Sequence, residues 1–130
     1  MKGGSNLDLN AILNRFAFLS GLTLTEAASF TQICNDAKTE IQLKIKSNVN
    51  ESAESGRLEA AAAALSFYKY ILYKASLQGT QSFSAGDVSI KEDIKQQLEN
   101  ARSIWYEAKA SVCDILQDDE FCFQKVTTYD

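Results

Sequence analysis

Apolar residues recur along this chain at spacings of three and four, which is the period of one face of an α-helix. Four such stripes predict helices near residues 7–20, 23–46, 54–77 and 89–117. Helices joined by short polar segments predict a mainly α, four-helix bundle-like domain over residues 1–117. The stripe residues are Leu9, Ile12, Leu13, Phe16 and Leu19; Ala27, Phe30, Cys34, Ala37 and Ile41; Leu58, Ala61, Leu65, Tyr68, Leu72 and Ala75; and Ile94, Leu98, Ala101, Trp105, Ala108, Val112 and Ile115.

Local signals predict where these helices begin and end. Gly21 follows the first stripe, and glycine often follows the last turn of a helix because it adopts a left-handed backbone easily. Thr23 and Ser89 are each followed three residues later by a glutamate. That spacing predicts a capping box at the start of the second and of the fourth helix.

The segments around residue 80 and after residue 117 carry different signals. Gly79 predicts the end of the third helix, so that residues 80–89 form a ten-residue loop before the last long helix, with a turn at Gly86-Asp87. Residues 118–130 begin with three acidic residues, which are unfavourable at the negative end of a helix dipole. An aromatic run follows them, so we expect an acidic turn and a short extended C-terminal tail.

Composition agrees with a single helical domain. The 130 residues are 45% apolar and 23% charged, and none of them is proline. These fractions are typical of globular proteins, and the length suits one domain. Because proline breaks the interior of a helix, its absence favours long uninterrupted helices.

The residue types exclude several kinds of chemistry. The chain has no histidine, which excludes Ser-His-Asp and Cys-His catalysis and any histidine-ligated metal. Neither common glycine-rich phosphate-binding motif is present. The adjacent acids Glu92-Asp93 and Asp118-Asp119-Glu120 do not face each other across a cleft, as general acid–base catalysis requires. We therefore expect a protein that is not an enzyme, with no catalytic residues, no cofactor and no metal.

Charge and cysteine content suggest the compartment and the partners. Thirteen basic against 17 acidic residues give a net charge of −4, which argues against sequence-specific nucleic-acid binding. No signal peptide and no apolar run of about 20 residues is visible, so we expect no membrane segment. Cys34, Cys113 and Cys122 are odd in number and lack CxxC spacing, which is not a disulfide framework. These features predict a cytoplasmic protein.

The third predicted helix carries apolar residues on two sides. Tyr70, Tyr73 and Leu77 lie nearly opposite its main stripe at about 100° per residue. A helix that is apolar on most sides is either central in its own bundle or exposed to a partner. The sequence leaves both alternatives open. Trp105, at the middle of the last stripe, is predicted to be buried against this helix near Tyr68 or Leu72.

The segment from Arg57 to Val126 has four features in a recognisable order. They are an alanine-rich helix that ends in aromatics (Leu58 to Tyr68), a loop from Ser82 to Ser89, a long amphipathic helix, and an acidic turn into an aromatic-x-aromatic tail (Leu116 to Phe123). In these features the chain resembles the small helical head–tail connector, or adaptor, proteins of tailed phages and prophages. The resemblance covers about half of the chain.

The resemblance implies a non-enzymatic structural subunit that assembles into a ring between portal and tail. Its partners would be further copies of itself and the portal and tail-side proteins, first in the host cytoplasm and then in the virion. It implies helix contacts within the ring and loops or termini that reach neighbours. The expected contact residues are Tyr70, Tyr73, Leu77, Phe83, Gly86, Asp87, Phe121 and Phe123.

A second hypothesis belongs to a different class of protein. The chain could instead be a helical adaptor or regulatory module of a bacterial cytoplasm, binding a partner helix in a groove. The two hypotheses differ in self-association. A ring subunit should assemble with rising concentration, whereas a simple adaptor should be a monomer or a dimer.

Overall fold

The computed structural model describes the backbone of residues 7–85 and 88–117 and the side chains of residues 7–77 and 92–117. The described backbone forms five helices and, apart from one isolated bridge, no β-structure, so the predicted mainly α, bundle-like class is confirmed. The helices are α1 (Leu9–Ser20), α2 (Leu24–Ala28), α3 (Thr31–Leu43), α4 (Ser55–Ala85) and α5 (Val88–Ser111).

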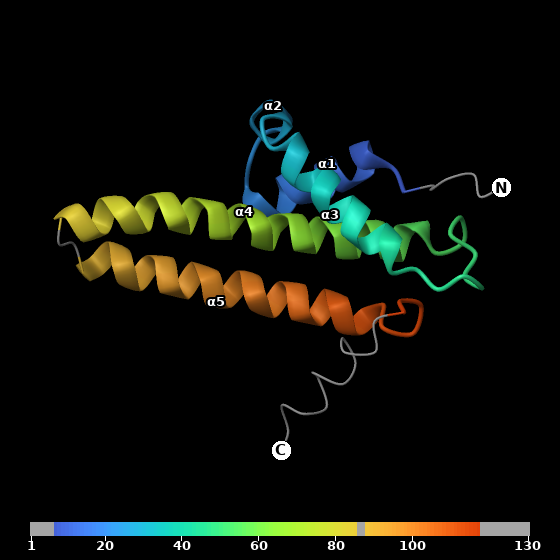
Figure 1. Cartoon of the computed structure of the whole chain (residues 1–130). Helices are drawn as coiled ribbons and strands as arrows, with labels where there is room; N and C mark the ends of the chain where they lie inside the picture. The colour runs from blue at the N-terminus through green and yellow to red at the C-terminus, as the bar shows by residue number, and fades with distance from the viewer. Residues whose placement is uncertain (1–6, 86–87, 118–130) are drawn as a thin grey trace, which may run out of the picture.

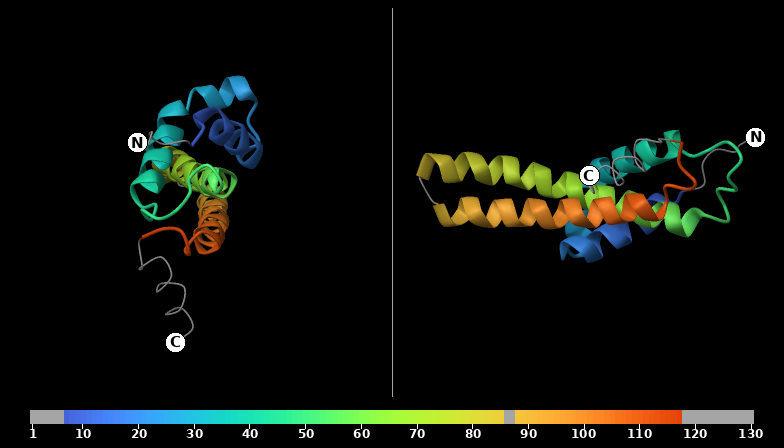
Figure 2. Two further views of the ribbon diagram at one scale, coloured as in Figure 1. Left: turned by 90° about the vertical axis from the view of Figure 1, so that its right-hand side faces the viewer. Right: turned by 90° about the horizontal axis from the view of Figure 1, so that it is seen from below.

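A long antiparallel hairpin of α4 and α5 forms the axis of the molecule (Figure 1). α1 and α3 pack across the N-terminal half of α4, on the side away from α5, and α2 packs on α1 (Figures 1 and 2). The other half of the hairpin extends beyond these three helices. We call this projecting part, residues 72–85 of α4 and 88–100 of α5, the helical arm.

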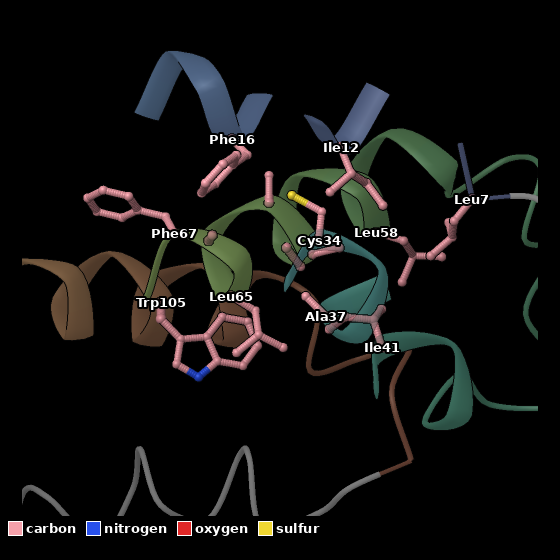
Figure 3. Close-up of a cluster of buried hydrophobic side chains, with 14 of the residues drawn as sticks. Leu7, Ile12, Phe16, Cys34, Ala37, Ile41, Leu58, Leu65, Phe67 and Trp105 are labelled. Atoms are coloured by element: carbon pink, nitrogen blue, oxygen red, sulfur yellow. The ribbon is translucent and has the colours of Figure 1, made fainter. Parts of the chain in front are cut away.

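The core surrounds the first half of α4. Ala61, Ala62 and Ala63 are almost completely buried because α1, α3 and α5 all approach this stretch of α4. Alanine has no side chain beyond Cβ, so it permits close helix packing while keeping the best helix propensity. The largest fully buried side chains around it are Phe16, Ile12, Ile41, Leu58, Leu116 and Val112, several of which Figure 3 shows.

The predicted signals around residues 21–26 are confirmed. Gly21 has φ of +74° and closes α1 by donating its N–H to the Ala17 carbonyl. At the start of α2, the Glu26 N–H donates to Thr23 Oγ1 at 3.1 Å, and the Thr23 N–H donates to Glu26 Oε1 at 2.9 Å. This is the reciprocal capping box that the sequence predicts.

The single helix predicted over residues 23–46 is wrong, because the chain breaks it into α2 and α3. The Ser29 and Phe30 N–H groups donate to carbonyls three residues back, which tightens and ends α2. Phe30 has a non-helical ψ of 25°. The break turns its ring toward the aromatic core, with the ring centroid 4.8 Å from that of Tyr70. No glycine or proline marks this break in the sequence.

The predicted end of the third helix at residue 77 and the ten-residue loop over 80–89 are also wrong. α4 continues through Gly79 to Ala85, and α5 begins at Val88. Glycine in a helix interior costs only about 1 kcal/mol relative to alanine, and packing along α5 outweighs that cost (Figure 1). The side chain of Ser89 lies outside the described side chains, so the second capping box stays a prediction.

The last helix ends at Ser111 and not near residue 117. Residues 112–115 form turns, and Leu116 forms an antiparallel bridge with Ile45 just after α3. The Lys46 N–H donates to the Ile115 carbonyl at 3.0 Å. α3 itself ends at Leu43, before the predicted residue 46, because Lys44 forms the closing turn and Ile45 pairs with Leu116. The predicted tail over 118–130 lies outside the described residues.

Candidate interaction surfaces

Tyr70 is part of the chain's own core. It is only 6% exposed, and its ring meets those of Phe16 and Phe30 edge to face at centroid distances of 5.4 and 4.8 Å (Figure 3 shows Phe16). α1 and the start of α3 therefore cover this side of α4, as the central-helix alternative predicts. Tyr70 is buried before any partner binds, and this removes it from the expected contact residues.

Tyr73 and Leu77 lie where that cover ends. Tyr73 is 49% and Leu77 is 50% exposed, and the Tyr73 ring centroid is 6.3 Å from that of Phe30, at the edge of the core. Leu72, expected in the core stripe, is 44% exposed as well. Tyr73 and Leu77 lie about 40° apart round α4 and form an apolar stripe on the helical arm, which we call the arm stripe, whereas Leu72 lies about 140° from Leu77. That Tyr73 and Leu77 contact a partner stays a prediction.

The other expected contact residues cannot be placed at a surface. The side chain of Phe83 and the residues Gly86, Asp87, Phe121 and Phe123 lie outside the described part of the structure. The backbone at position 83 belongs to α4, so this position is on a helix and not in the predicted loop. Nothing further follows for these five positions.

A groove that the sequence does not predict lies between α1, α4 and α5. Its volume is about 660 Å³. Its floor is made of alanines at 60, 63 and 64 from the alanine run of α4, with Ala108 of α5. Phe18, which is 86% exposed, and Leu19 form the α1 wall together with Arg15. Ile104 and Glu107 stand on the α5 wall.

Two sequence signals could have indicated this groove. The five-alanine run gives this stretch of α4 no large side chains, and Phe18 falls outside the stripe of the first helix. A single large aromatic off the core face is common in a monomer, so it indicates a surface site only together with neighbouring apolar residues. Phe18 and the alanine run are far apart in the sequence, so the sequence alone does not show that they are close in space.

Trp105 is buried, as predicted, with 7% of its surface exposed. It belongs to the hydrophobic core, where Figure 3 shows it beside Leu65. Tyr68 packs against the same core, whereas Leu72 is exposed. The Lys109 ammonium lies 5.7 Å from the Trp105 ring centroid and 4.5 Å from that of Tyr106. A cation over aromatic rings is attracted by their quadrupoles, which orients this lysine along α5.

An ionic cluster joins the start of α4 to the end of α5. The Arg57 guanidinium donates to the Ser111 carbonyl at 2.6 Å and to Asp114 Oδ1 at 2.8 Å, and it pairs with Glu54 at 3.0 Å. The hydrogen bond from Arg57 lowers the pKa of the Asp114 carboxyl below its ordinary value. The bonds to Asp114 and then Glu54 raise the pKa of Arg57. This cluster caps α5 and has a structural role.

Among the described side chains, the Cys34 thiol and the carboxylates are the groups to consider for nucleophilic attack and metal binding. Burial raises the pKa of the Cys34 thiol, and a hydrogen bond with Ser66 only partly offsets that effect, so this thiol is a poor nucleophile. Within residues 7–77 and 92–117, no group of three or more Cys, Asp or Glu side chains is placed to hold a metal ion. None of the described helices combines the length and the hydropathy needed to cross a bilayer.

Comparison of this chain with protein-family models, with curated proteins and with solved structures found no match. Two surfaces of the molecule could bind a partner: the arm stripe on the projecting hairpin and the groove beside the alanine run.

Proposed function

We propose that this chain is a non-enzymatic structural subunit of a tailed phage or prophage, a head–tail connector that assembles at the portal vertex. The observation that carries the proposal is the helical arm, which projects from the rest of the molecule and exposes Leu72, Tyr73 and Leu77 (Figure 1). A two-helix hairpin cannot bury all of its own apolar surface, so a neighbouring subunit would cover the arm stripe.

The shape of the molecule supports the same proposal. A body of packed helices with a helical arm projecting at one end can join to a neighbour at a fixed angle, which closed rings require. The partners would be further copies of the chain and the portal and tail-side proteins. The net charge of −4 would suit a channel through which DNA passes without binding. The chain would act in the host cytoplasm during assembly and then in the virion.

Deletion of the gene from the prophage that carries it tests this function. Induction of the deleted strain should yield DNA-filled heads without tails in electron micrographs, and a plasmid copy of the wild-type gene should restore tailed particles. Normal numbers of tailed, infectious particles from the deleted strain would refute the proposal.

The groove favours a second candidate function. A groove of about 660 Å³ with an alanine floor and one aromatic wall could take an amphipathic helix, as a cytoplasmic adaptor module would. On that hypothesis the protein stays a monomer at every accessible concentration, because its groove binds a different protein. Sedimentation of the isolated chain separates this function from ring assembly.

A further inference from the structure

We draw no further inference here: the strongest candidate, the exposed apolar stripe of Tyr73 and Leu77 on the helical arm, is a surface patch for which nothing in the structure shows what covers it.

Discussion

Tyr70 and Tyr73 are three residues apart on α4, but they have different surroundings. Tyr70 is 6% exposed among the rings of Phe16 and Phe30, while Tyr73 is 49% exposed at the edge of the core. The reach of α1 and α3 along α4 explains the difference, since the cover ends between the two residues. At the residue scale, the boundary between core and surface is therefore one helical turn wide.

Serine substitution of these tyrosines should separate the two environments. Tyr70→Ser should lower the free energy of unfolding by roughly 3–5 kcal/mol, because it removes a buried aromatic ring and leaves a cavity. Tyr73→Ser should change it by less than about 1 kcal/mol, because half of that ring is in solvent. Urea unfolding followed by circular dichroism measures both. Equal losses for the two variants would contradict the core boundary described above.

Trp105→Ala should also cost roughly 3–5 kcal/mol in unfolding free energy, because Trp105 is almost fully buried between α5 and the core. Trp105 is the only tryptophan, so unfolding of the variant has to be followed by circular dichroism. In the wild type, the fluorescence of this residue should shift to longer wavelength on unfolding. A loss below about 1 kcal/mol would place Trp105 at the surface.

At the scale of the elements, two glycines that look alike in the sequence have opposite roles. Gly21 ends α1 with φ of +74°, a backbone conformation that other residues rarely adopt. Gly79 lies within α4, where the helix continues for six further residues to Ala85. Both positions predict a helix end, and the partners of each helix decide which one is real.

Alanine substitution of the two glycines tests this difference directly. Gly79→Ala should raise the unfolding free energy by about 0.5–1 kcal/mol, since alanine favours a helix interior more than glycine does. Gly21→Ala should lower it by about 1 kcal/mol, because a side chain is strained at a positive φ. Thermal or urea unfolding gives both values. Destabilisation by Gly79→Ala would indicate that the helix ends there after all.

The ionic cluster at the end of α5 should make the free energy of unfolding depend on pH. The pKa of Asp114 is lower in the folded protein than its ordinary value near 3.8, so the folded state binds this proton less readily than the unfolded state. The stabilisation is therefore complete above that ordinary value, and it is lost as the pH falls through the lower folded pKa.

Asp114→Asn should remove this contribution. At neutral pH the variant should be less stable than wild type by at most about 1 kcal/mol, because the pair is exposed and solvent screens it. As the pH falls below 3.8 the difference should shrink, since the wild-type carboxyl then becomes protonated and loses the charge that pairs with Arg57. Urea midpoints of both proteins across this range measure the effect. A difference that grows on acidification would contradict the assigned pairing.

The whole molecule combines a well-covered half with a projecting half. α4 has neighbours on several sides in its first half, whereas the helical arm is a two-helix structure (Figure 2). Local stability follows the amount of burial, so the two halves of one helix should open at different rates. The same asymmetry makes the arm available for contact with another molecule.

Amide hydrogen exchange should show this gradient along α4. Amides at residues 58–71 should exchange slowest, at rates set by global unfolding, and those at residues 72–85 should exchange faster by local opening of the arm. Mass spectrometry of peptic fragments resolves the two stretches. Uniform exchange along α4 would contradict an arm that opens independently.

The sequence by itself determined the features that depend on near neighbours. The period of apolar residues established the helices, since an amphipathic stripe is a local pattern. Thr23 and Glu26 determined the capping box because the two residues bond each other across one turn. Trp105 could be assigned to the core because it lies in the middle of a long apolar stripe, which is also a local pattern.

Only the tertiary structure decided the features that depend on distant residues. Phe30 breaks the predicted second helix because its ring packs with Tyr70, which is 40 residues away. Ile45 ends α3 by bridging to Leu116. The groove exists because α1 and α5 stand apart over the alanines of α4, and no local pattern records that spacing. Local propensities differ by about 1 kcal/mol or less per residue, so packing between distant segments determines helix ends and surfaces.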